Sequence, residues 1–207
     1  VADSHSRTLA ALVSTSDNLS SSERGERGGK AGDFRTVPLA CVFQQLFRDP
    51  EDREHPSVPL RYHARPLGDI DSLDAVFPEA FEALHPTEVT RLIDGSDSLG
   101  AAFRAVFGSN DHERAVRSDF TAVLSHLDAL LRRYCWCVPS DTQADVPDVS
   151  LYDHLHTTAA IASCLYQFHA KTGTLTEQQV KSACAERFLL LAGDMSGIQD
   201  YIFDIAN

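Results

Sequence analysis

The stretch Ser150-Leu-Tyr-Asp-His-Leu-His-Thr-Thr-Ala-Ala-Ile-Ala162 predicts a helix that packs closely against a neighbour. Ser150 followed by Asp153 is a capping signature at a helix start, and we expect this helix to continue to about His169. The residues from Thr157 to Ser163 are mostly small, which favours the close approach of a second helix. A mainly α fold is therefore the first expectation.

Helical periodicity appears in three other parts of the chain. Residues 7–22 predict a helix, and residues 77–107 predict helical pieces that break near Pro86 and at Asp94-Gly95. Residues 118–134 are the clearest helix, and its broad apolar face predicts a place in the core. The face of the first helix carries Leu9, Leu12, Val13, Ser16 and Asp17, and that of the third carries Phe120, Val123, Leu124, Leu127, Leu130, Leu131 and Tyr134.

Short apolar runs predict a small amount of β structure. Residues 37–43 and a run centred on Leu60, Tyr62 and Leu67 read as two short strands, which nearby prolines confine to sheet edges. Residues 187–193 predict a strand, and residues 197–206 predict a helix that follows it. Such a strand opens an α/β domain and is buried on both faces only when the rest of its sheet is present.

The charge balance excludes nucleic-acid binding through bulk charge. The 207 residues include 18 Lys and Arg against 30 Asp and Glu, which gives a net charge of −12. Neutralising phosphates requires an excess of basic side chains. Any contact with nucleic acid must be local, as at the basic loop of Arg24, Arg27 and Lys30, or shared with a partner.

The remaining composition is typical of a globular intracellular protein. Hydrophobic residues make up 43% and charged residues 23% of the chain, and the five cysteines have no C-x-x-C spacing, so we expect reduced core thiols. No apolar run approaches the ~20 residues of a membrane helix, and no secretory pattern is present. Because the first residue is Val1 and the only methionine is Met195, we expect the natural start to be absent.

Asp17 is the first candidate for chemistry, because the predicted helix turns its carboxylate inward with Val13. A buried carboxylate must be neutralised, hydrogen-bonded or bound to a metal. From periodicity alone, a pair with Arg24 or a helix cap is a simpler explanation than a metal. His5 lies about 18 Å from Asp17 along one unbroken helix, so both can bind one ion only if a turn separates them.

Two other groups of residues have both a structural and a functional interpretation. His154 and His156 point roughly opposite ways on a helix and cannot bind one metal together, so we interpret them as structural. Residues 193–199 read Gly-Asp-Met-Ser-Gly-Ile-Gln, where a glycine turn and a helix N-terminus suit phosphate. Asp194 stands where α/β folds place ligand-binding groups, although a helix cap by Asp194 or Ser196 explains the same pattern.

Four segments of the chain together resemble one protein family. Residues 14–24, 130–139, 149–162 and 191–203 are similar, in that order, to the large subunit of type III-A CRISPR interference complexes, the Csm-type effector. The last segment is the most specific and favours the Csm-type subunit over the related Cmr-type one. Thr15-Ser16-Asp17 replaces the usual Ala-Asp of the family.

The resemblance implies an HD-type helical nuclease domain over residues 1–183 and the start of a ferredoxin-like palm domain over residues 184–207. The nuclease would cut single-stranded DNA with a divalent metal such as Mn, Ni, Co or Mg. Asp17 matches the last aspartate of the metal site, as ligand and catalytic residue, and His5 is a weaker match for a ligand. Asp194, Ser196 and Gly197 would face a nucleotide.

The intact protein would also convert ATP into cyclic oligoadenylate when target RNA is bound. Its expected partners are the other complex subunits, guide RNA, target RNA and single-stranded DNA in the cytoplasm, with no membrane. The family's adjacent His-Asp pair and its Gly-Gly-Asp-Asp motif are not in this sequence. An HD-like scaffold that has lost its metal is therefore the alternative, while a free-standing phosphohydrolase would leave the palm-like tail without a purpose.

Overall fold

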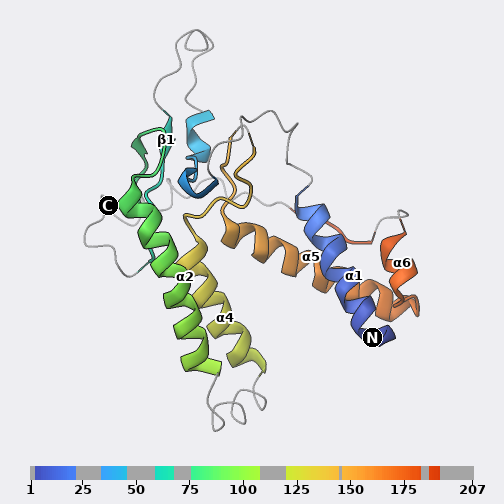
Figure 1. Cartoon of the computed structure of the whole chain (residues 1–207). Coiled ribbons are helices and arrows are strands. Elements are labelled where there is room, and N and C mark those ends of the chain that lie inside the picture. Colours follow the sequence, from blue (N-terminus) through green and yellow to red (C-terminus); the bar gives the residue numbers. More distant parts are fainter. Residues whose placement is uncertain are drawn as a thin grey trace, which may run out of the picture.

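The computed structural model describes residues 3–21, 34–45, 59–67, 76–107, 120–144, 146–182 and 187–191. This part of the chain is mainly helical with one small antiparallel sheet, which confirms the predicted fold class in its coarse form. In Figure 1, α2 and α4 form one pair of helices, and α1, α5 and α6 form a second group. The elements are α1 (Ser4–Ser20), the 3-10 turns η1 (Phe34–Thr36) and η2 (Val42–Gln45), β1 (Leu60–Arg61), β2 (Glu79–Ala80), α2 (Pro86–Phe107), α4 (Phe120–Cys135), α5 (Leu151–Thr172) and α6 (Glu177–Lys181).

Helix α5 forms as the capping signature predicts. The Ser150 hydroxyl accepts a hydrogen bond from the Asp153 backbone N–H at 3.0 Å. The helix runs three residues beyond His169 and ends at Gly173, whose φ of 68° is a left-handed conformation that favours glycine. Within the small-residue run Thr158 is buried and Ile161 packs against the core, so the expected close packing holds for part of the run.

Helix α1 buries the predicted face at Leu12 and Ser16 only, and its buried side is turned toward Thr8 and Ala11. Leu9 and Val13 are exposed, whereas Thr8 and Ser16 are buried beside Ala11 and Leu12. The Ser16 hydroxyl donates to the Leu12 carbonyl at 2.8 Å, and that of Thr8 donates to the Ser4 carbonyl at 3.0 Å. These small polar side chains satisfy their own hydrogen bonds, which offset the cost of burying them.

The apolar core lies where α1 packs against α5 and α6. It is built from Ala11, Leu12, Leu165 and Val180, with Ile161 and Leu175 packed around them. Leu165 and Val180 are almost completely buried. Because α1 contacts both α5 and α6, this core fixes how the N-terminal helix sits on the C-terminal pair.

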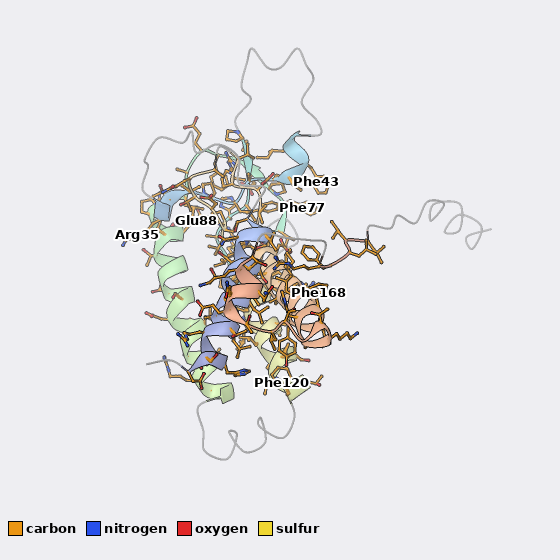
Figure 2. The ribbon with its side chains drawn as sticks, turned by 90° about the vertical axis from the view of Figure 1, so that its right-hand side faces the viewer. Arg35, Phe43, Phe77, Glu88, Phe120 and Phe168 are labelled. Atoms are coloured by element: carbon orange, nitrogen blue, oxygen red, sulfur yellow. The ribbon has the colours of Figure 1, made fainter. Side chains whose placement is uncertain are left out.

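Helices α2 and α4 each differ from the sequence prediction in one respect. Helix α2 continues through Asp94 and Gly95, since a glycine within a helix costs only about 1 kcal/mol and α4 packs alongside. Helix α4 is not a core helix, because Phe120 is 75% exposed and Leu124 and Leu127 are also exposed. Figure 2 shows Phe120 near the lower end of the coloured ribbon. Among the described elements α4 contacts α2 and α5, and neither helix covers these three side chains.

The β structure also differs from the predicted pair of strands. β1 pairs with β2, with Leu60 opposite Ala80 and Arg61 opposite Glu79, so the second strand lies in a stretch predicted to be helical. Residues 37–43 contribute only a single bridge, from Ala40 to Arg61. Pro38 has no N–H to donate, which limits any ladder on that segment.

Residues 187–191 do not form the predicted strand. No partner strand pairs with them among the described residues, and Leu189, Leu190 and Leu191 are largely exposed. Residues 192 and 193 and the predicted helix over 197–206 lie outside the described part of the chain. In the described segments, no helix has the length and apolar character needed to cross a membrane.

We expect Leu165→Ala to lower the free energy of unfolding by about 2–5 kcal/mol, because it empties the centre of the α1, α5 and α6 core. Urea unfolding measures the effect. Leu189→Ala is the matched control and should change stability little, since Leu189 is 79% exposed. Equal losses in the two variants would contradict this placement of the core.

We also expect stability to fall as the pH drops through the ordinary pKa of histidine, 6.5. Burial, followed by the nearby Arg187, lowers the pKa of His169, so the unfolded state binds a proton more readily than the folded state. His169→Asn should reduce the loss of melting temperature between about pH 8 and pH 5.5. His126→Asn, an exposed position on α4, is the control, and an identical pH profile in both variants would refute the prediction.

Candidate functional site

Asp17 and His154 meet where the end of α1 lies against the start of α5. The Asp17 Oδ1 atom lies 2.8 Å from His154 Nε2. Asp17 occupies the last turn of α1, while His154 occupies the first turn of α5 and donates its backbone N–H to the Ser150 carbonyl. Two helices joined through a common core therefore position this pair.

The second ring nitrogen of His154 contacts the Ser20 hydroxyl, which also contacts the Thr158 hydroxyl. Ser20 Oγ lies 3.1 Å from His154 Nδ1 and 2.7 Å from Thr158 Oγ1. Ser20 Oγ also lies 3.0 Å from the Asp17 backbone carbonyl, to which it can donate. Both ring nitrogens of His154 thus have a polar partner, and the side chain is only 7% exposed. These contacts and the burial fix the orientation of the imidazole.

Asp17 is not buried as the sequence predicts. Its side chain is 51% exposed, because α1 buries the neighbouring face that carries Ser16. The carboxylate keeps contact with water and does not need a neutralising partner. Arg24, one alternative partner, lies outside the described residues, and among the described residues Asp17 contacts His154.

The structure does not bring His5 to Asp17. His5 is exposed in the first turn of α1, and α1 runs unbroken from Ser4 to Ser20. The two residues are thus separated by about 18 Å of helix. His156 is also exposed and lies against the Tyr152 ring, with 5.6 Å between ring centroids, which agrees with its structural interpretation.

Sequence reasoning recognised both halves of the pair but not their contact. The sequence makes Asp17 a candidate and predicts that His154 is a packed, hydrogen-bonded residue. That interpretation agrees with its burial and its partners. Thr158 lies one turn after His154, so the sequence places two polar side chains on the same face of the helix. Periodicity does not show which other helix that face contacts.

Among the described residues, two atoms at this site could bind a metal ion, Asp17 Oδ1 and His154 Nε2. Within the described segments no group of three or more His, Cys, Asp or Glu side chains has the arrangement to hold a metal ion. Imidazole nitrogen and carboxylate oxygen are both metal ligands, and they approach one another here from two helices. Asp194, Ser196 and Gly197, the predicted nucleotide residues, lie outside the described residues.

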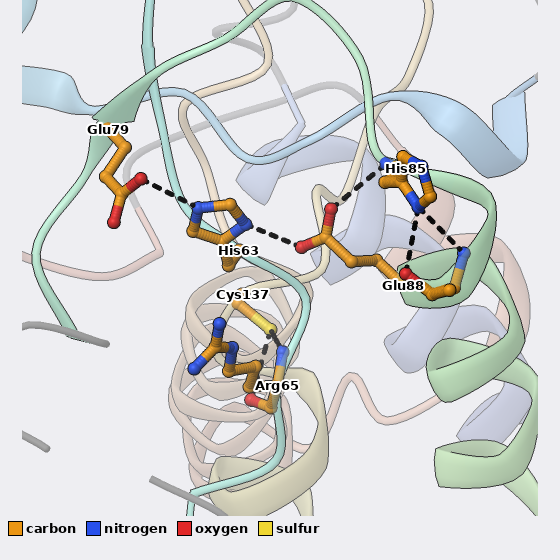
Figure 3. Close-up of polar contacts among 7 residues, drawn as sticks. His63, Arg65, Glu79, His85, Glu88 and Cys137 are labelled. Carbon is orange, nitrogen blue, oxygen red and sulfur yellow. Dashed lines mark hydrogen bonds and ion pairs between the residues drawn. The ribbon is translucent and has the colours of Figure 1, made fainter. Parts of the chain in front are cut away.

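A second polar cluster, centred on His63, joins β1, β2 and α2 (Figure 3). His63 Nδ1 lies 2.7 Å from Glu88 Oε1, and its Nε2 lies 3.4 Å from Glu79 Oε2. Burial acts to raise the pKa of Glu88, but hydrogen bonds from the His85 backbone and His63 outweigh it and keep this pKa below its ordinary value. His63 also stacks on Phe81, and sequence reasoning did not identify this cluster.

Comparison with known proteins gives a single family of relatives. The chain is 36% identical to a protein of Methanocaldococcus jannaschii over 237 aligned residues, covering 95% of this chain and 26% of the relative. It is 39% identical to a Mycobacterium tuberculosis protein over 101 residues, 43% of this chain and 12% of that protein. Both relatives are described as CRISPR system single-strand-specific deoxyribonuclease Cas10/Csm1 (subtype III-A).

A third relative, from Enterococcus italicus, carries the same description and is 39% identical over 79 residues, 33% of this chain and 10% of its own length. No protein-family model matches the chain. The relatives place the chain among CRISPR-associated proteins of subtype III-A. More particularly, it is homologous to the Cas10/Csm1 large subunit, which confirms the resemblance seen in the sequence. The chain spans about a quarter of the length of the Methanocaldococcus relative.

We expect the Asp17 and His154 side chains to stabilise one another by no more than about 1 kcal/mol, because the carboxylate is half exposed and screened by water. A double-mutant cycle of Asp17→Asn and His154→Asn, followed by urea unfolding, measures this coupling. A coupling energy above about 2 kcal/mol would contradict the prediction and indicate a desolvated pair.

Proposed function

We propose that the protein provides part of a metal-dependent single-strand-specific deoxyribonuclease in a type III-A CRISPR large subunit, with Asp17 as a metal ligand in an HD-type site. The homology to Cas10/Csm1 proteins over 95% of the chain supports the class of activity. The contact of Asp17 Oδ1 with His154 Nε2 at 2.8 Å is the observation that carries the choice of site. One donor is exposed to solvent and the other is held rigidly.

The donor set fits a transition metal better than magnesium. Imidazole nitrogen suits Mn, Co and Ni, whereas Mg prefers an all-oxygen shell that includes several waters. Two protein donors do not complete a coordination shell, so water or further side chains would supply the remaining ligands. His5 is too far along α1 to be one of them while Asp17 binds the same ion.

The hydrogen bonds around His154 are consistent with a ligating Nε2. In that state Nδ1–H donates to Ser20 Oγ, the Thr158 hydroxyl also donates to Ser20 Oγ, and Ser20 in turn donates to the Asp17 carbonyl. A hydrogen bond from the second ring nitrogen sets the tautomer and the orientation of a ligating histidine. Ser20 and Thr158 would thus hold Nε2 toward Asp17.

A bound divalent metal would lower the pKa of its water and polarise the scissile phosphodiester. Asp17 would contribute negative charge at the solvent-facing edge, where a polymeric substrate can reach it. His154 would keep its ring fixed during the reaction, because Ser20 contacts its Nδ1 atom and the core of Leu12 and Leu165 holds the two helices together.

The wider activity of the intact protein is part of the same proposal. ATP would be converted into cyclic oligoadenylate by palm domains, of which residues 184–207 are the start, with Asp194, Ser196 and Gly197 at the nucleotide. Other complex subunits, guide RNA and target RNA would be its partners. The net charge of −12 implies that this chain alone binds single-stranded DNA weakly.

We expect Asp17→Asn to abolish metal-dependent cleavage of single-stranded DNA while oligoadenylate synthesis continues. The substitution removes an anionic ligand and leaves the helix and its packing intact. Cleavage of a labelled oligonucleotide with Mn²⁺ is the measurement in the assembled full-length protein. Asp3→Asn is the matched control, since Asp3 caps the same helix at its opposite end.

Unchanged cleavage by the Asp17→Asn variant would assign Asp17 and His154 to a structural contact between α1 and α5. The absence of cleavage by the unmodified complex with Mn²⁺, Co²⁺ or Ni²⁺ would instead favour an HD-like scaffold that organises the complex without a metal. Equal loss in the Asp3→Asn variant would attribute the effect to the stability of α1.

A further inference from the structure

A cavity of about 540 Å³ lies away from the Asp17 and His154 pair, between α2, the end of α4 and the start of α5. Its size falls within the range of about 300–1,000 Å³ that small-molecule sites occupy. Most of its wall is apolar, with Val37, Val89, Leu99 and Val138 among the contributing side chains. The charged side chains on the wall are Arg35, Arg65 and Asp97, so cations outnumber anions there among the described residues.

Arg65 carries the signal that this cavity takes an anion. Its Nε atom is buried and has no hydrogen-bond acceptor among the described residues. A buried guanidinium N–H without an acceptor is costly, so native structures pair nearly all such groups. Because Nε itself is closed off, an oxyanion within the cavity would accept from the terminal nitrogens of Arg65, which are not among the buried atoms.

The backbone of Arg65 is held in place before any ligand arrives. The Trp136 indole N–H donates to the Arg65 carbonyl at 2.6 Å, and the Arg65 N–H donates to Cys137 Sγ at 3.3 Å. Burial raises the pKa of the Cys137 thiol to about 11, so the thiol stays neutral and also donates to the Arg65 carbonyl. Figure 3 shows Arg65 against Cys137. A fixed backbone lowers the entropy cost of placing the guanidinium on a ligand.

We propose that this cavity binds an organic phosphate of nucleotide size, with the phosphate on Arg65 and the base against the apolar wall. An inorganic ion would leave the apolar wall without contacts, and a purely apolar molecule would leave the charge of the Arg65 guanidinium without a counter-charge. Tyr134 contributes an aromatic side chain to the lining. Ser96, Asp97 and Thr142 contribute hydroxyl and carboxylate groups that can meet the polar edge of a base.

The phosphate can come from a free mononucleotide or from the 5′ end of a nucleic-acid strand, because both present the same phosphate and base. Binding here is local, so it is compatible with the net charge of −12. Neither Asp17 nor His154 lines the cavity. The proposal therefore stands or falls independently of the nuclease site.

Isothermal titration with deoxyadenosine monophosphate tests the proposal, with inorganic phosphate and deoxyadenosine as separate probes. We expect saturable binding of one nucleotide per chain, tighter than the binding of either probe. Arg65→Gln should weaken binding about tenfold or more, because it removes a charge-assisted contact. Arg104→Gln is the matched control, since it removes an exposed arginine of α2 beyond the part that lines the cavity.

Ser96→Phe provides a second variant that does not depend on Arg65. Ser96 is exposed at the rim, so a larger side chain can fill the cavity without disturbing the core, and binding should be lost. A 5′-phosphorylated dinucleotide that competes with the mononucleotide would support a strand end as the source, and failure to compete would support a free nucleotide.

Three results would overturn the proposal. The first is no binding of the nucleotide at millimolar concentration. The second is equal binding of deoxyadenosine and its monophosphate, because Arg65 would then play no part. The third is an equal loss in the Arg65→Gln and Arg104→Gln variants, which would indicate bulk electrostatics.

Discussion

The packing of α1 against α5 is the constraint on which the candidate site depends. Leu12 and Leu165 are nearly completely buried between these helices, and Val180 of α6 closes the same core. Asp17 and His154 lie at one end of this contact, and because Asp17 is half exposed their attraction is too weak to hold two helices together. The apolar packing therefore places the polar pair, and the 2.8 Å contact is a result of the fold rather than its cause.

The sequence predicts features that depend on neighbouring residues, such as the start of a helix, but not which helices pack against each other. The start of α5 follows from Ser150 and Asp153, since a capping interaction involves only neighbouring residues. The predicted face of α1 is right at Leu12 and Ser16, which are buried. It is wrong at Leu9 and Val13, because the helix turns Thr8 and Ala11 toward the core instead. Periodicity makes Asp17 a candidate, and the family resemblance implies its role as a metal ligand. Its contact with His154 joins residues 137 positions apart, and periodicity does not show which helices meet.

The Glu88–His63 and Asp17–His154 pairs differ in how far the carboxylate is buried, and this difference decides whether the carboxylate is open to a ligand. Glu88 is buried, and its oxygens accept from His63 and from the His85 backbone, so its carboxylate is occupied in joining β1 and β2 to α2. Asp17 uses one oxygen on His154 and remains half exposed. The same two types of side chain thus make a closed structural contact in one place and leave a donor accessible to water in the other.

Net charge describes the protein as a whole, but recognition depends on where each charge lies. A chain with a charge of −12 repels phosphates near its surface, and salt screens this repulsion beyond a Debye length of about 10 Å at 0.1 M ionic strength. Inside a cavity with apolar walls that screening is weaker, and one arginine without an acceptor can outweigh distant carboxylates. Arg65 meets this condition because Trp136 and Cys137 hold its backbone while its Nε is buried. An acidic protein can therefore hold a phosphate at one internal position while its outer surface leaves strand binding to partners.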